Sequence, residues 1–294
     1  MRLLQLSTVL VADDLTSTSD GAMRTARTIG ESAGAALHIA HVAPRESGII
    51  ANTGKRSEAI AAIEETAARA GIRASYTPHV LTGSAAESIG ELADRISADA
   101  IICGRRSAKS RVPIERPLGG TAYAIITHSL VPCLAVNIPL TMPVRRVVVA
   151  IDCSEASRGA MVVALSWTSA LRGRDGTPPL LTALRVHDPS ESDDSKRLVD
   201  HELDIVRRSA GDWAGVAVSG VTRPGTEAAS VITDLAASVG ADLIVLGTRG
   251  LSPAAGGRGS LGSVSAAVLG AVKAPVLLVP PAVWRNYARD VDVF

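Results

Sequence analysis

The chain has 294 residues, and at roughly 150 residues per domain this length predicts two domains. Hydrophobic residues make up 47% of the sequence and charged residues 20%, which excludes a disordered or fibrous protein. Thirty basic against 29 acidic residues give a net charge of +1, which supplies no broad field to attract nucleic acid or anionic lipid, so we expect neither as a partner.

The three cysteines, Cys103, Cys133 and Cys153, form no CxxC pair, so the sequence indicates neither a disulfide framework nor a zinc site. No stretch reaches the roughly 18 consecutive apolar residues that a membrane helix needs. The opening residues 1–6 are too short an apolar segment for a signal peptide. We therefore expect a cytoplasmic protein with no membrane partner.

Short apolar runs alternate with longer helical patterns along the chain, which predicts βαβ units and a parallel sheet buried on both faces. Five strands are expected in the first half, at residues 8–13, 36–42, 73–81, 100–103 and 133–136. Between them lie helices such as residues 57–70, where Ile60, Ile63 and Ala67 recur at helical spacing. A linker with two prolines follows at residues 137–144. Five more strands are expected at residues 146–151, 180–186, 215–221, 243–246 and 276–279.

The two halves repeat one another. Residues 9–23 (VLVADDLTSTSDGAM) match residues 147–161 (VVVAIDCSEASRGAM) at an offset of 138, and residues 98–104 (ADAIICG) match 241–247 (ADLIVLG) at an offset of 143. Such a repeat means that each half is one structural unit. The predicted fold class is therefore α/β, with two similar five-stranded parallel α/β sandwich domains at residues 1–140 and 145–294.

The turns after strands one and four are the places to look for a ligand, because open parallel sheets bind ligands at the carboxyl ends of their strands. In the second half strand four runs into GTRG at residues 247–250, and after a spacer of eleven residues GSVS at 262–265 opens a helix. Glycine supplies positive φ and close backbone approach, and a helix start presents unpaired N–H groups, so this pattern predicts a cradle for phosphate. A structural alternative remains open, in which Gly250 forms a turn and Ser263 only N-caps the helix.

These segments together resemble the universal stress proteins, whose ATP-binding members have the motif G-x2-G-x9-G-[ST] between strand four and helix four. The resemblance covers nearly the whole chain, twice. It depends on VAIDCS at 149–154, ADLIVLGTRG at 241–250, LGSVSAAVL at 261–269 and APVLLVP at 274–280. It implies a five-stranded parallel α/β sandwich for each half and, for a tandem member, an intramolecular pseudo-dimer in which the last strands of the two halves meet.

The resemblance further implies that the second domain binds an adenine nucleotide, ATP with or without Mg²⁺. Ala150 and Ile151 would line the base, Asp152 would face the ribose, and the backbone of Val186 would contact adenine. The phosphates would be wrapped by Gly247, Arg249, Gly250, Gly262, Ser263, Val264 and Ser265. The spacer between Gly250 and Gly262 departs from the motif because it holds eleven residues, not nine, and such a loop loses more conformational entropy when it closes.

The first half departs further from the motif, with GRRS at residues 104–107 and GGTA at 119–122. Ser107 replaces the second motif glycine, and Gly120 replaces the hydroxyl residue. We expect this site to bind nucleotide weakly or not at all. A solvated loop face is the preferred interpretation of its basic residues, with an anion site as the open alternative; these residues are Arg105, Arg106, Lys109, Arg111 and Arg116.

Other patterns predict no separate site. His38 and His41, three apart on a strand, point to opposite faces and cannot share a metal ion. Asp13 is expected to be solvated or to cap a turn. The aromatic-rich tail at residues 284–294 is expected to pack over the seam between the halves or to contact another subunit, so a homo-oligomer remains open.

The function expected from this resemblance is that of a cytoplasmic stress-response protein that binds ATP in its C-terminal domain and acts as a nucleotide-dependent sensor or regulator. One alternative is a slow Mg²⁺-dependent ATP hydrolase in which Asp152 positions water. Another is a nucleotide-free interaction scaffold. The sequence assigns no catalytic residue and no protein partner.

Overall fold

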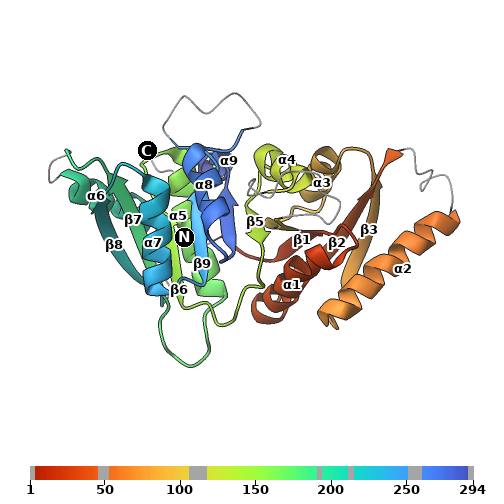
Figure 1. The fold of residues 1–294 in the computed structure, drawn as a ribbon. Coiled ribbons are helices and arrows are strands. Elements are labelled where there is room, and N and C mark those ends of the chain that lie inside the picture. Colours follow the sequence, from red (N-terminus) through yellow and green to blue (C-terminus); the bar gives the residue numbers. More distant parts are fainter. Residues whose placement is uncertain are drawn as a thin grey trace. The chain divides into compact units, whose positions relative to one another are not determined.

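The computed structural model describes residues 4–45, 53–105, 118–190, 194–210, 215–250 and 260–290. Contacts within the chain divide it into two units, Leu6–Leu140 and Thr141–Phe294, the second of which also includes the opening residues. The backbone N–H of Leu4 donates to Ser166 Oγ of the second unit at 3.1 Å. Each unit is an α/β sandwich with a five-stranded parallel sheet, which confirms the predicted fold class (Figure 1).

The first unit has the strand order β3-β2-β1-β4-β5, and the strand pairs are parallel. Its strands are β1 (Thr8–Ala12), β2 (Ala36–Ala43), β3 (Tyr76–Thr82), β4 (Ala100–Gly104) and β5 (Cys133–Val136). Its helices are α1 (Asp20–Ala33), α2 (Thr53–Ala70), α3 (Ala85–Arg95) and α4 (Gly120–His128), with a short 3-10 turn, η1 (Ser17–Ser19), before α1. Contacts join α1 with α2 and α3 with α4, as expected of helices on opposite faces of one sheet.

The second unit repeats this topology, with the order β10-β9-β6-β7-β8. Its strands are β6 (Arg146–Ala150), β7 (Leu180–His187), β8 (Ala217–Pro224), β9 (Leu243–Gly247) and β10 (Val276–Val279). Its helices are α5 (Glu155–Ala170), α6 (Asp194–Ala210), α7 (Ala228–Val239), α8 (Ser263–Ala271) and α9 (Pro281–Asp290). Contacts join α5 with α6 and α9 and, separately, α7 with α8 (Figure 1).

All ten predicted strands are present, and β5 and β10 have the predicted bounds. The third strand of each unit starts later than expected, at Tyr76 and at Ala217. Helix α2 begins at Thr53, four residues before its predicted start. Its first turn is polar and exposed, so it gives no apolar periodicity from which a helix start could be read.

Small residues allow the helices to lie close to the chain around them. A Cβ built on Gly159 in α5 would lie 3.2 Å from the backbone N of Trp284 in α9. Trp284 and Tyr287 are buried, and Arg285 Nε donates to Glu155 Oε2 at 2.6 Å. The described part of the predicted tail therefore packs on α5 of its own domain, whereas residues 291–294 lie outside the described residues.

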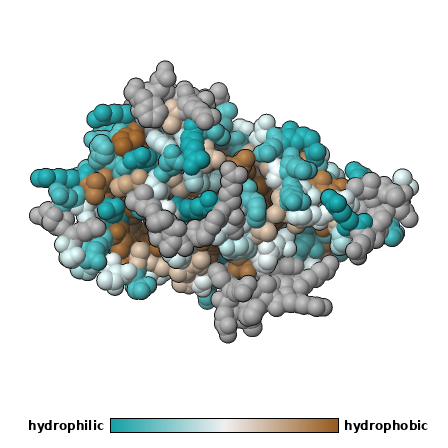
Figure 2. All heavy atoms as spheres, turned by 90° about the horizontal axis from the view of Figure 1, so that it is seen from above, coloured by the Kyte–Doolittle hydropathy of each residue, from teal (hydrophilic) through white to brown (hydrophobic). Residues whose placement is uncertain are grey.

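The described surface has few large exposed hydrophobic side chains. They are Tyr123, Leu130, Ile138, Leu180, Leu198 and Val264. Figure 2 shows hydrophobic areas interspersed with hydrophilic ones on the face seen from above. Within the described ranges, no helix combines the length and apolarity required to cross a lipid bilayer.

Candidate ligand site

A cavity of about 460 Å³ lies in the second domain, lined by the residues that end β6, β7 and β9 and by the first turns of α7 and α8. All eleven residues that the sequence singled out line this one cavity: Ala150, Ile151, Asp152, Val186, Gly247, Arg249, Gly250, Gly262, Ser263, Val264 and Ser265. Seven further lining residues were missed: Ser157, Leu184, Ala228, Ile232, Leu246, Ser260 and Leu261.

Some of these missed residues could have been found from the sequence, and others could not. Leu184 lies two residues before Val186 on β7, so strand alternation alone could have placed it on the same face. Ala228 and Ile232 come from α7, which contacts β7 only through the tertiary fold. They add an apolar wall that no local motif marks.

Strands β6 and β7 separate at the cavity. Their last hydrogen bond is from Ile151 N to Leu184 O, at 2.9 Å. Val186 lies two residues further, so its N–H and C=O are directed to the same side as those of Leu184. No hydrogen bond joins Val186 to the segment after β6 among the described residues. A backbone donor and acceptor are thus available at the edge of the cavity.

The turn between β6 and α5 brings Asp152 to the cavity. Cys153, the next residue, has a left-handed φ of 66°, and Ser154 N-caps α5 by accepting a hydrogen bond from Ser157 N at 3.1 Å. Asp152 Oδ1 accepts from Ser154 N at 3.1 Å. A Cβ built on Gly250 would lie 2.5 Å from Asp152 Oδ2, so the carboxylate lies directly against the Gly250 backbone.

The glycines of the motif provide space and not positive φ. Gly247, Gly250 and Gly262 all lie outside the left-handed region, and Gly262 has φ −59° and ψ 147°. A Cβ on Gly247 would lie 2.8 Å from Ala156 Cβ in α5. The expectation of positive φ was therefore wrong, because what these positions require is close approach of the backbone to neighbouring groups.

The first turn of α8 faces the cavity with unpaired N–H groups. Gly262, which has no side chain with which to cap, is the N-cap residue, and Ser263 is the first helical residue, so the alternative that Ser263 N-caps the helix is wrong. No described residue accepts a hydrogen bond from the N–H of Ser263, Val264 or Ser265. These amides and the helix dipole form a locus that favours an anion.

The charged side chains among the described lining residues are Arg249 and Asp152. No group of three or more His, Cys, Asp or Glu residues that could hold a metal ion occurs in the described part of the chain. The chain's own groups at this site are therefore suited to an anionic ligand with an apolar portion.

A polar network lies behind the Asp152 turn. Arg158 in α5 donates from Nε and Nη2 to the buried Glu202 in α6, both at 2.8 Å, and Arg185 Nη1 lies 3.6 Å from Cys153 Sγ. Burial, followed by the neighbouring Glu202 carboxylate, raises the pKa of the Cys153 thiol. Cys153 is thus a protonated packing residue in a strained turn, with no sign of an activated thiolate.

The matching groups of the first domain bond among themselves. The Asp14 carboxylate accepts from Thr16 N at 3.1 Å, from Thr16 Oγ1 at 2.7 Å and from Thr18 Oγ1 at 3.0 Å. Asp13 is buried, not solvated, and its carboxylate accepts from Ser19 Oγ and Thr66 Oγ1, each at 2.5 Å, and from Leu15 N at 2.9 Å.

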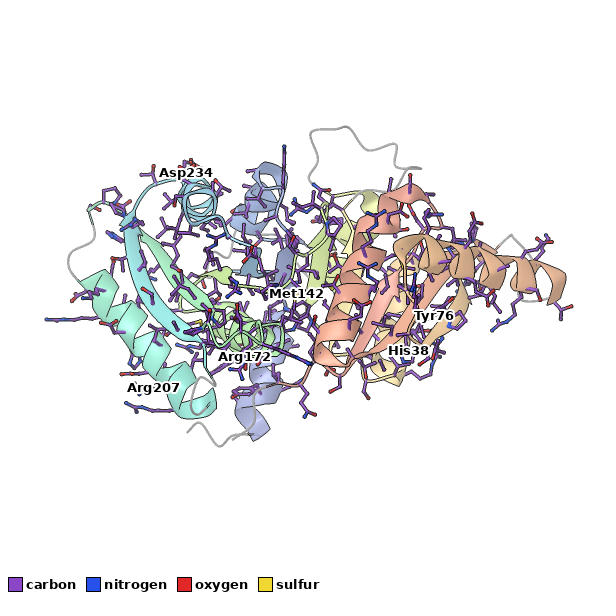
Figure 3. The ribbon with its side chains drawn as sticks, turned by 90° about the horizontal axis from the view of Figure 1, so that it is seen from below. His38, Tyr76, Met142, Arg172, Arg207 and Asp234 are labelled. Atoms are coloured by element: carbon purple, nitrogen blue, oxygen red, sulfur yellow. The ribbon has the colours of Figure 1, made fainter. Side chains whose placement is uncertain are left out.

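The histidines of β2 confirm the expected alternation. The backbone carbonyl of Asp13 lies 3.0 Å from His41 Nδ1. His38, labelled with Tyr76 of the neighbouring strand in Figure 3, lies with Nδ1 2.9 Å from Nε2 of His79, a partner that the sequence did not reveal. The two histidines of the strand thus serve different faces and different partners.

Arg105 corrects the interpretation of the first-domain loop. Its side chain is only 2% exposed, so it is not part of a solvated face, and burial lowers its pKa to about 10. It occupies the position of Thr248 in the second domain, by the offset of 143. The other residues of this prediction, Ser107, Arg106, Lys109, Arg111 and Arg116, lie outside the described residues, as do the spacer residues 251–259.

The repeated parallel sheets, the helices on both faces and the cavity at the carboxyl ends of the strands define a tandem α/β protein of the doubly wound class. The model of the universal stress protein family matches residues 6–137 and 143–280. The chain therefore belongs to the universal stress protein family. Two such domains in one chain are consistent with the expected intramolecular pseudo-dimer.

Two solved structures are similar to this chain over nearly its whole length, and a third over about half of it. A universal stress protein from Archaeoglobus fulgidus DSM 4304 is 20% identical with a TM-score of 0.67, covering 95% of this chain and all (100%) of that one. A putative universal stress protein from Pseudomonas aeruginosa UCBPP-PA14 is 14% identical with a TM-score of 0.58 and 98% coverage of both chains. A universal stress protein in complex with cAMP is 22% identical with a TM-score of 0.38, covering 46% of this chain and 98% of that one. No match is found among curated proteins.

Proposed function

We propose that the C-terminal domain binds an adenine nucleotide, with ATP as the principal candidate, and that the protein acts in the cytoplasm as a nucleotide-dependent sensor or regulator in a stress response. The observation that supports this proposal most strongly is the convergence of all eleven predicted residues on one cavity of about 460 Å³. Family membership supports the stress-response role.

The apolar wall and the free backbone of Val186 suit a purine base. Leu184, Ile232 and Leu246 supply aliphatic surface, and burying such surface with a base is favourable. Adenine presents a hydrogen-bond donor and an acceptor on its Watson–Crick edge, which the C=O and N–H of Val186 can pair. Asp152 lies in the turn after β6 and has a carboxylate suited to accept from ribose hydroxyls.

The phosphates would lie at the first turn of α8. The N–H groups of Ser263, Val264 and Ser265 would donate to phosphate oxygens, with Arg249 as the nearby cation. A Mg²⁺ ion that accompanies ATP would be held mainly by the phosphate oxygens, with Asp152 the acidic side chain of the described lining.

Calorimetry of the full chain with ATP, and with adenosine for comparison, tests the proposal. ATP should bind and raise the melting temperature by mass action. At a free ATP concentration of one hundred times Kd, the free energy of unfolding should increase by about 2.7 kcal/mol. Adenosine should bind more weakly because it lacks the phosphates. An unchanged melting temperature in saturating ATP, together with the absence of nucleotide in the protein as purified, would contradict binding and favour the scaffold alternative.

The hydrolase alternative has one supporting observation, the Asp152 carboxylate lying against Gly250 beside the proposed phosphate position. A single-turnover assay with labelled ATP and Mg²⁺ separates binding from hydrolysis. Product formation that disappears in Asp152→Asn while ATP still binds would establish the enzyme. Intact ATP after hours of incubation would support a role through occupancy.

A further inference from the structure

The hydroxyl of Ser265 is already used within the protein. Ser265 Oγ donates to the backbone carbonyl of Gly247 at 2.7 Å, and the residue is buried. A serine hydroxyl has one hydrogen, so while it makes this bond it cannot also donate to a phosphate. The Ser265 hydroxyl is therefore not available as a direct donor to phosphate, and this side chain has a different role.

A second hydrogen bond accompanies the first. The N–H of Gly262 donates to the carbonyl of Thr248 at 2.9 Å. We name these two bonds, Ser265 Oγ to Gly247 O and Gly262 N to Thr248 O, the α8 clasp. The clasp fixes the first turn of α8 to the end of β9, where the amides of Ser263 and Val264 face the cavity.

The first domain contains only half of this clasp. The bond equivalent to the one at Gly262 is present there, from Gly119 N to Arg105 O at 2.7 Å. The position of Ser265 is taken by Ala122, which is equally buried at 6% exposure but has no hydroxyl. Helix α4 nevertheless begins one residue after Gly119, as α8 begins one residue after Gly262. Folding of this turn does not require the hydroxyl.

We propose that Ser265 is a positioning residue, which holds the first turn of α8 so that its amide hydrogens converge on the anionic part of the ligand, while the Ser263 hydroxyl and the amides make the direct contacts. This inference rests on the proposed function and refines it. A fixed set of donors loses less conformational entropy on binding than a turn that must be ordered by the ligand.

Hydrogen exchange and calorimetry on the full chain test the role of Ser265. In ligand-free Ser265→Ala, the amides of residues 262–266 should exchange about fivefold faster, the scale of one lost neutral hydrogen bond. The affinity for ATP should fall by about the same factor, while that for adenosine stays unchanged. Ser265→Thr should restore both readouts. Ser238→Ala is the control, because it removes an exposed hydroxyl of α7 that bonds to Leu235 O.

Two outcomes would overturn the proposal. If Ser265→Ala weakens ATP binding but leaves exchange in the ligand-free protein unchanged, Ser265 contacts the phosphates directly. If exchange rises but ATP affinity is unchanged, the clasp has no positioning role.

Tripolyphosphate, which has no base or ribose, keeps the test separate from the adenine proposal. If ATP does not bind, the effect of tripolyphosphate on exchange of the 262–266 amides is compared between wild type and Ser265→Ala. A weaker effect in Ser265→Ala supports the clasp. An equal effect in the two proteins, or no effect in either, contradicts it.

Discussion

The two domains share a topology, but the groups at matching site positions have different partners. Each has a left-handed residue directly after the site aspartate, Leu15 with φ 61° and Cys153 with φ 66°. In the first domain Asp14 accepts three local hydrogen bonds, whereas Asp152 lines a cavity. The left-handed turn therefore belongs to the fold that both copies share, whereas the hydrogen bonds that the aspartate accepts differ between them.

The backbone and the buried cation extend this contrast. The carbonyl of Asp13 has His41 as its partner, while no described residue donates to the matching carbonyl of Ile151. Buried Arg105 stands where the second domain has the much smaller Thr248. The described groups that follow β1 in the first domain thus bond one another, and a polar ligand there would have to exchange one set of hydrogen bonds for another.

The largest expected effect on ATP binding comes from filling the space at Gly250. A Cβ there would lie 2.5 Å from Asp152 Oδ2, so Gly250→Val should displace the carboxylate and obstruct the proposed phosphate position. We expect ATP affinity to fall about 100-fold or more, measured by calorimetry. Gly120→Ala in the first domain is the control, because a Cβ there meets nothing within 4 Å. Wild-type affinity in Gly250→Val would show that the phosphates lie elsewhere.

The buried Asp13 network of the first domain should matter for stability and not for ligand binding. Asp13→Ala removes an acceptor from Ser19 and Thr66, which are buried beside it. We expect the first domain to lose about 3 kcal/mol of unfolding free energy, measured by hydrogen exchange of its β1 and β4 amides. ATP binding should be unchanged. A loss below about 0.5 kcal/mol, the range of ordinary surface substitutions, would contradict the network's role.

A smaller effect, dependent on pH, is expected at the His38–His79 pair. Burial lowers the pKa of both histidines, and the charge of Arg95 adds to the effect at His79. The unfolded chain then binds more protons than the folded one just below pH 6.5, so stability decreases as the pH falls through this region. His79→Gln should make the free energy of unfolding depend less steeply on pH, by a slope well below the one-proton limit of about 1.4 kcal/mol per pH unit because solvent screens these partly exposed rings. The exposed His201→Gln is the control, and equal slopes in wild type and His79→Gln would refute the prediction.

Much of the site could be predicted because its residues follow strands in a repeated chain. Glycine-rich turns after a buried strand mark the carboxyl edge of a parallel sheet, which predicted a site at Gly250 and Ser263, and the family resemblance added Asp152; all three line the one cavity. Ala228 and Ile232 could not be found this way, because α7 reaches the cavity only by packing across β7. The role of Ser265 was also hidden, since a hydroxyl can donate inward or outward and only the neighbouring carbonyl decides.

The sequence by itself determined the family, the repeated α/β fold and eleven of the residues that line the cavity, because apolar periodicity, the internal repeat and the family's glycine motif are all local properties of the chain. Tertiary structure alone decided which polar groups are satisfied within the protein. Whether Arg105 is solvated or buried, whether His41 meets the carbonyl of Asp13, and whether Ser265 donates to Gly247 depend on atoms that only the completed packing brings within hydrogen-bond distance.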